Sequence, residues 1–188
     1  MSVPVITPSG PLSLRGKQTV SFTSSVPVNW SASGGEFTST AGTATTWTAP
    51  NQTGAWAVTA TAQSGGQTTT VTATVTGVLP FAPDYQTQHS ADKKVLTFEA
   101  EDGSLQVRIK RGRRRESELK FTGRPMDEYM EMDAFWDWHY PDREFWYTEP
   151  LLKEHAAAIE YLARFLTKIN HSPQSFDNFE YAFTIREK

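Results

Sequence analysis

The sequence predicts a mainly β protein, with an N-terminal β-sandwich and a C-terminal β-rich α+β domain that contains one helix. The first observation is composition, because residues 1–78 contain 18 threonines and few of the residues that favour helices. The second is charge. Residues 1–78 carry only Arg15, Lys17 and Glu36 as charged side chains, whereas 16 bases and 20 acids follow them. This break in surface chemistry predicts two domains, residues 1–78 and 79–188.

The clearest element of the first domain is a hairpin. Apolar side chains alternate along residues 55–62, turn chemistry follows at 64–67, and alternation returns along 68–76. We expect Trp30 and Trp47 to fill the middle of the sandwich. The other candidate strands, separated by Pro, Gly and Ser, are residues 3–7, 19–24, 26–31 and 44–48.

The second domain follows a short proline-punctuated connector, residues 78–83. An Asp-Gly turn predicts a hairpin between residues 95–100 and 105–110. Pro125 then opens a predicted helix from Met126 to Trp138. Its predicted apolar stripe contains Tyr129, Met132, Phe135 and Trp136, widened by Met126, Met130 and Trp138. Strands are predicted at 116–122, 144–148 and 179–186, while periodicity alone leaves 151–167 open between helix and strand.

The first domain resembles the immunoglobulin-like domains of bacteria and phages. The string WTAPNQTGAWAVTATA, after VNWSASGGEF, is similar to their late strands, and the resemblance covers residues 1–77. It implies an immunoglobulin-like β-sandwich and no particular ligand. A row of exposed threonines could contact host-surface carbohydrate, but threonine also keeps an uncharged sandwich soluble, and we favour that interpretation.

The second domain resembles the group of phage minor tail protein M and distal tail proteins over about residues 93–187. The motifs are EDGSLQVRIKRG, ELKFTG, DEYMEMDAFWDWHY, EFWYTEP and a closing pair that ends in FEYAFTIRE. Phe135 and His139 match the helix segment of that family, and residues 145 and 147–150 match its aromatic strand. Where the family has glycine after the histidine, this chain has Tyr140-Pro141-Asp142. The resemblance implies a strand at 157–167 and a structural role in a ring that joins the tail tube to the tail tip.

A run of basic residues is the strongest electrostatic feature of the chain: Arg108, Lys110, Arg111, Arg113, Arg114 and Arg115. Nucleic-acid binding is one interpretation, but the domain is net acidic and no stacking motif surrounds the run. A solvated face is another. We favour an interface to the acidic surface of a neighbouring subunit, because arginine meets carboxylates bidentately.

Two further groups are candidates on the predicted helix. Phe135 and Trp136 are expected to form one aromatic cluster with Phe145 and Tyr147, because an amphipathic helix before an aromatic strand covers a sheet by packing on it. Asp133 and Asp137, near His139, superficially suggest a metal or acid-base site. One helix face supplies too few ligands, so we expect a solvated surface there.

The sequence predicts a structural protein and not an enzyme. The chain has no cysteine, so disulfides, thiolate nucleophiles and cysteine-bound metals are excluded. No phosphate loop or nucleophile-base pair is evident, and we expect no cofactor and no catalytic residues. The N-terminus shows no signal-peptide pattern, and no apolar run is long enough to span a membrane. The expected partners are a homo-oligomeric ring and other tail proteins of the virion; a cell-surface binding module and a nucleic-acid-binding protein are the alternatives.

Overall fold

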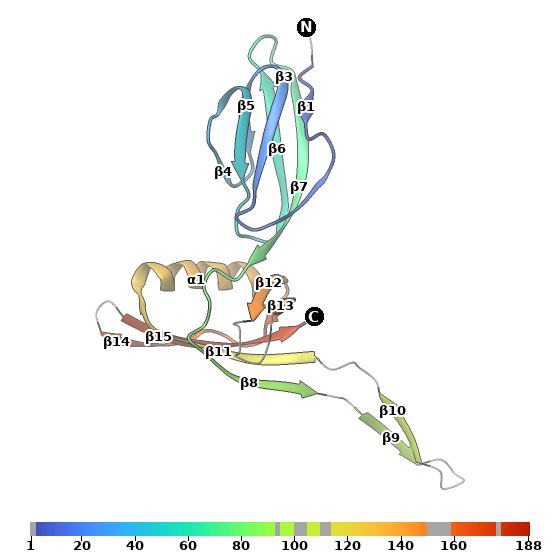
Figure 1. Ribbon diagram of the computed structural model, residues 1–188, viewed down its shortest axis with the longest axis vertical. Helices are drawn as coiled ribbons and strands as arrows, with labels where there is room; N and C mark the ends of the chain where they lie inside the picture. Colours follow the sequence, from blue (N-terminus) through green and yellow to red (C-terminus); the bar gives the residue numbers. More distant parts are fainter. Residues whose placement is uncertain (1–2, 93–94, 100–104, 110–113, 150–158, 176–177) are drawn as a thin grey trace. The chain divides into compact units, whose positions relative to one another are not determined.

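The computed structural model describes residues 3–92, 95–99, 105–109, 114–149, 159–175 and 178–188 (Figure 1). Within these ranges the protein is mainly β with one helix, which confirms the predicted fold class. The chain forms two compact units. Unit 1 contains Met1–Pro80 and Arg143–Tyr147, and unit 2 contains Phe81–Asp142 and Thr148–Lys188. The boundary near residue 80 lies beside the charge break, but the return of residues 143–147 to unit 1 has no counterpart in the predicted domains.

Unit 1 is built from seven strands in the order β4-β5-β3-β6-β7, with β1 on β3 and β2 on β7. The β2 and β7 strands are parallel, whereas the other pairs in this group are antiparallel. The strands are β1 (Ile6–Thr7), β2 (Leu12–Arg15), β3 (Thr19–Ala32), β4 (Glu36–Phe37), β5 (Ala41–Thr48), β6 (Gly54–Ala62) and β7 (Thr68–Val78).

The long strand β3 allows the sheet to fold over on one core. Two separate strands were expected here, but β3 is continuous, with a register shift between Thr23 and Val28. Its first part pairs with β1 and β5, and its last part pairs with β6 along Val28–Ala32 and again with β5 at Val28 and Asn29. Side chains from β1, β3, β5, β6 and β7 therefore meet in a single cluster that includes Phe22, Trp30 and Trp47. The expected central position of the two tryptophans is confirmed, since Trp30 is 3% exposed and Trp47 is fully buried.

The predicted hairpin is confirmed as β6 and β7, with Thr61 opposite Thr68 and Gly54 opposite Val75. Alternation places Val58 and Ala60 of β6, and Ala73 and Val75 of β7, in the core. Their neighbours in sequence face away from it. The expected strand 3–7 is shorter than predicted, because only Ile6 and Thr7 pair with β3.

The segment that returns to unit 1 pairs with the end of β7. Strand β12 (Phe145–Glu149) runs parallel to β7, with Phe145 opposite Gly77 and Trp146 opposite Val78. Asn51 holds the other side of Val78: its side-chain oxygen accepts from Val78 N at 2.8 Å and its amide donates to Val78 O at 2.7 Å. The Thr53 hydroxyl accepts from Gly77 N and donates to Glu144 O. Polar side chains thus replace a neighbouring strand here.

Unit 2 contains an antiparallel sheet in the order β13-β15-β11-β8, with β14 also paired to β15. Strands β9 and β10 form a separate two-stranded sheet, which confirms the predicted hairpin. The strands are β8 (Tyr85–Asp92), β9 (Val95–Glu99), β10 (Leu105–Ile109), β11 (Arg114–Pro125), β13 (Ile159–Phe165), β14 (Asn170–Ser175) and β15 (Asn178–Glu187). The strand implied by the family resemblance at 157–167 is present over its described part as β13; residues 150–158 lie outside the described residues.

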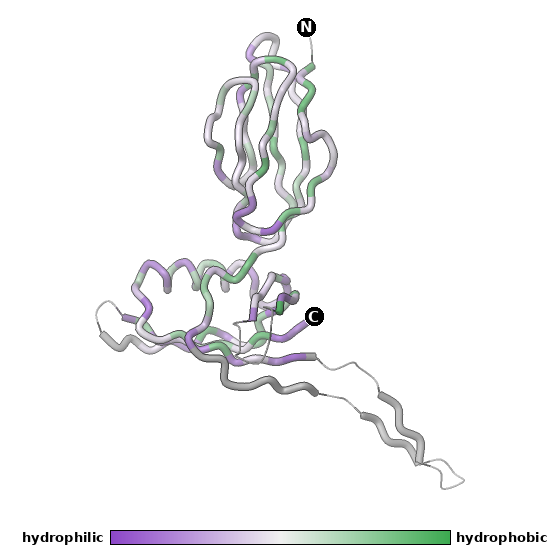
Figure 2. Tube along the Cα trace, viewed as in Figure 1, coloured by the Kyte–Doolittle hydropathy of each residue, from purple (hydrophilic) through white to green (hydrophobic). Residues whose placement is uncertain are grey.

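The helix α1 (Met126–His139) begins after Pro125 and ends before Tyr140, close to its predicted bounds. Pro125 has φ of -65° and opens the helix, while Asp127 and Glu128 lie in the first turn, where negative charge is favoured. The helix contacts β11, β13 and β15, so it covers one face of the sheet. Figure 2 shows hydrophilic and hydrophobic residues interleaved along the helix. The buried stripe is narrower than predicted, because Met126 is 46% exposed and Met130 is 61% exposed.

No helix of the described ranges has both the length and the apolar character needed to cross a membrane.

Candidate interaction surface

The two faces of the unit 2 sheet differ in chemistry. One face is apolar: Leu119 and Phe121 of β11 and Phe183 and Ile185 of β15 are at most 2% exposed. They lie on the side of α1, where Phe135 contacts Phe165 edge to face at 6.1 Å between ring centroids. The alternate residues of the same strands face the other way and carry most of the charges, as expected for a half-buried sheet.

The outer face of β11 and β15 is crossed by ion pairs. Glu116 lies directly opposite Arg186 in the strand register, and the two side chains form a salt bridge. Further along, Lys120 pairs with Glu180. Cross-strand pairs of opposite charge stabilise a sheet by a few tenths of a kcal/mol, up to about 1 kcal/mol each. These pairs give the outer face a fixed pattern of charge.

At one end of the sheet Arg115 joins an internal cluster. Its guanidinium lies 3.4 Å from the Glu149 carboxylate and 4.0 Å from that of Glu187, and it lies over the Tyr161 ring at 5.9 Å. Glu149 is only 5% exposed. A buried carboxylate is costly without a cation, so Arg115 stabilises unit 2 as well as contributing to the basic run.

The rest of the predicted basic run is placed only in part. Arg108 lies in β10 and Arg114 begins β11. Lys110, Arg111 and Arg113 lie outside the described residues. The interface to an acidic neighbour therefore stays a prediction for this run.

A second arginine, which sequence reasoning missed, joins three segments of unit 2. Arg124 donates to Asp84 at 2.7 Å, to Glu128 at 3.1 Å and to the backbone oxygen of Ala82 at 3.0 Å. Burial lowers the pKa of Arg124, but the hydrogen bond and charge of Glu128 and the charge of Asp84 outweigh it, and the pKa is raised. The guanidinium therefore fixes the start of α1 against the chain before β8. Only the four-residue spacing of Arg124 and Glu128 could have indicated part of this arrangement.

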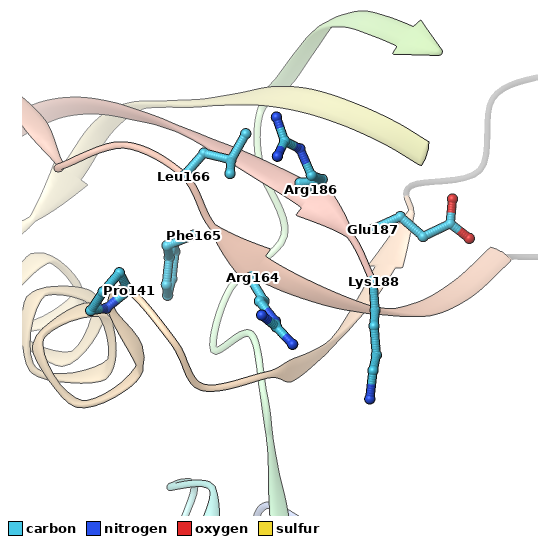
Figure 3. A pocket seen from close by; sticks show the side chains of 7 residues that line it. All are labelled: Pro141, Arg164, Phe165, Leu166, Arg186, Glu187 and Lys188. Carbon is cyan, nitrogen blue, oxygen red and sulfur yellow. The ribbon is translucent and has the colours of Figure 1, made fainter. Parts of the chain in front are cut away.

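A hollow of about 290 Å³ opens beside the ends of β13 and β15 (Figure 3). Arg164 and Arg186 lie directly opposite each other on these strands and share a face. Figure 3 shows their guanidinium groups pointing away from each other, and Arg186 forms the salt bridge with Glu116. The lining residues are Pro141, Arg164, Phe165, Leu166, Arg186, Glu187 and Lys188. Because they come from three segments that are far apart in the sequence, no local pattern could predict this hollow.

The predicted aromatic cluster is found in part. Phe135 is 4% exposed and its ring lies 4.0 Å from that of His139, while Trp136 stacks on Tyr140 at 4.7 Å. Phe145 and Tyr147 are also buried. The joining of Phe135 and Trp136 to these two residues stays a prediction.

The prediction of a solvated acidic side of α1 is wrong at one residue. Asp133 and Asp137 are exposed as expected, but His139 is fully buried. Its Nδ1 lies 2.7 Å from the carbonyl oxygen of Phe135, one helical turn earlier. This bond and the ring contact with Phe135 account for the burial of a polar ring. Within the described ranges no group of three or more acidic or histidine side chains is arranged to hold a metal ion.

Two threonines on neighbouring strands of unit 1 pair their hydroxyls with each other. Thr59 lies opposite Thr70, and their hydroxyl oxygens are 3.0 Å apart. Such pairs satisfy hydroxyl groups within the sheet and add to its stability. We assign no ligand to this face.

Neither a protein-family model nor a curated protein matches this chain.

Proposed function

We propose that this protein is a structural component of the virion of a long-tailed phage, a subunit of a ring at the tail tip that joins the tail tube to the tip. The observation that carries the proposal is the order of elements in unit 2. The hairpin of β9 and β10, strand β11, helix α1, strand β12 and the terminal strand β15 follow one another in the order of the family motifs. In this proposal the immunoglobulin-like unit 1 is displayed outward.

The hairpin of β9 and β10 also favours an assembly role. It pairs with no other described strand. An isolated two-stranded hairpin is marginally stable in water and is stabilised by a further strand or a packed surface. A neighbouring subunit in a ring supplies such a surface. The basic run from Arg108 to Arg115 begins within this hairpin, and we propose that it meets acidic side chains of the neighbour.

Charge reversal within the basic run tests this interface. Arg113→Glu with Arg114→Glu is expected to abolish ring formation without changing the circular dichroism spectrum. Arg115 is left intact, because its loss would remove the cation beside Glu149. Lys168→Glu with Lys17→Glu, two exposed positions, is the control with the same change of charge. Unchanged rings in the first variant would show that the basic run does not form this interface.

The proposed function itself is tested on intact particles. An antibody raised against residues 3–78 is applied to tailed particles released by the bacterium in which the gene is expressed, and bound antibody is located by electron microscopy. We expect labelling at the end of the tail distal to the head. Absence of the protein from particles, or labelling at another position, would contradict the proposal.

A further inference from the structure

We infer that this protein binds a second copy of itself through α1: the outward stripe of α1 in one copy occupies the hollow beside Arg164 in the next. The inference rests on the proposed function, because it names the partner and the residues of one ring contact. It adds a second contact to the one proposed for the basic run.

The first half of this contact is the outward side of α1. Met126 and Met130 lie one turn apart and are the exposed large hydrophobic residues of unit 2 within the described ranges. Methionine is flexible and polarizable, which suits it to irregular binding surfaces. Four exposed acids surround the two methionines along the helix: Asp127, Glu131, Asp133 and Asp137. The outward side of α1 is therefore an apolar stripe bordered by negative charge.

The second half is the hollow at the ends of β13 and β15. Phe165, Leu166 and Pro141 supply an apolar lining, and Arg164, Arg186 and Lys188 supply three basic side chains against one acid, Glu187. Arg164 and Lys188 are exposed. Carboxylates brought by a partner would meet the exposed Arg164 and Lys188, while Arg186 keeps its salt bridge with Glu116.

The outward stripe of α1 and the hollow are complementary in chemistry and lie on different parts of unit 2. An acidic helix side with an apolar centre complements a basic hollow with an apolar lining, and such charge complementarity fixes register and excludes wrong partners. Because the two surfaces are different parts of one unit, the contact is heterologous. Repeated head to tail, heterologous contacts close into a ring when the rotation permits. The same pairing thus suits the proposed role.

Cysteine cross-linking tests the contact, and the chain has no cysteine to interfere. Full-length Met130→Cys is mixed with full-length Leu166→Cys and treated with a short thiol cross-linker. A heterologous contact predicts at least about tenfold more cross-linked dimer in the mixture than in either variant alone. Met130→Cys mixed with Ser31→Cys, an exposed position in unit 1, is the control. Equal yields in the two mixtures would overturn the inference.

Charge reversal provides a second readout in sedimentation velocity. Arg164→Glu with Lys188→Glu is expected to weaken self-association about tenfold or more, and Asp133→Lys with Asp137→Lys to do the same. All four changes together are expected to restore it substantially. The Lys17→Glu and Lys168→Glu control should associate like the unchanged chain. Lack of rescue, or unchanged association in the first variant, would overturn the contact.

The outcome separates this inference from the proposed function. If the protein is found at the tail tip but the mixture gives no specific cross-link, the helix contact is wrong and the tail-tip role stands. If the specific cross-link forms but particles lack the protein, the contact stands and the tail-tip role is wrong. A chain that stays monomeric at every concentration without any cross-link overturns the helix contact.

Discussion

Gly35 and Gly66 both have a left-handed backbone, with φ of 80° and 66°, but their surroundings differ. A Cβ at Gly35 would lie 2.3 Å from Thr48 O and 2.6 Å from Trp47 Nε1, whereas a Cβ at Gly66 would meet nothing within 4 Å. We expect Gly35→Ala to cost about 3 kcal/mol or more and Gly66→Ala about 1 kcal/mol, because only the first adds a clash to backbone strain. Thermal melting of the two full-length variants measures this. Equal losses would contradict the described packing around Trp47.

Tyr181 gives unit 2 a defined response to alkaline pH. Its ring stacks on Phe121 at 4.7 Å, and its buried hydroxyl has no hydrogen-bond partner among the described residues. Burial raises the pKa of Tyr181 above the ordinary value of 10.0, and the charge of Arg124 only partly offsets this. The unfolded chain therefore loses the phenolic proton first. The contribution of Tyr181 to the free energy of unfolding is full below about pH 10 and falls as the pH rises further.

We expect Tyr181→Phe to leave the free energy of unfolding near neutral pH unchanged or slightly higher, because it removes an unpaired buried hydroxyl. Between about pH 10 and pH 11 the variant should lose less stability than the unchanged chain. Part of the decline remains, since burial also raises the pKa of Tyr129 and Tyr161. Urea unfolding across this range is the measurement. Parallel declines in the two proteins would show that Tyr181 does not titrate on unfolding.

At the residue scale, the local sequence pattern predicted the burial of side chains whose position within a strand determines it. Trp30 and Trp47 lie in the core of unit 1, as expected. His139 was expected to be exposed. It is buried because its ring contacts the ring and the carbonyl oxygen of Phe135. The position of Arg124 depends on Asp84, which is distant in the sequence. The contact between Arg124 and Asp84 leaves no local signal in the sequence.

At the element scale, helix α1 packs on the sheet through buried side chains that include Met132 and Phe135. Phe135 is 4% exposed and contacts His139 and Phe165, whereas Asp137 is exposed on the other side. Truncating a buried aromatic costs about 3 to 5 kcal/mol. Phe135→Ala should therefore lower the melting temperature of the full chain sharply, and Asp137→Ala should change it little. Small and equal effects would show that the helix does not pack on the sheet.

Most strands with alternating apolar residues were predicted, although β2, which reads LSLR, was not. The hairpin of β6 and β7 and the terminal strand β15 follow clear alternation. Strands β8 and β14 read YQTQHSAD and NHSPQS, which contain no apolar alternation. They form because β8 hydrogen-bonds to β11 and β14 hydrogen-bonds to β15. The parallel pairing of β12 with β7 joins segments far apart in the sequence.

At the scale of the whole molecule, the return of residues 143–147 to unit 1 changes what a truncation removes. The charge break at residue 78 by itself predicts that residues 1–77 fold alone and are dispensable for assembly. A chain that starts at Leu79 lacks Gly77 and Val78, which pair with Phe145 and Trp146. We expect this truncated chain still to enter particles but to melt at a lower temperature than the full chain. Incomplete tails from a folded truncated chain would make unit 1 part of the ring.

We propose that copies of this protein surround the tail axis at its tip, an arrangement that cryo-electron microscopy of intact tails would reveal. We expect rotationally repeated density at the tail end distal to the head. Each repeat should fit the sheet of unit 2 with α1 on one face and an immunoglobulin-like body projecting outward. A tail tip whose repeated density cannot accommodate this fold, or particles without the protein, would contradict the account.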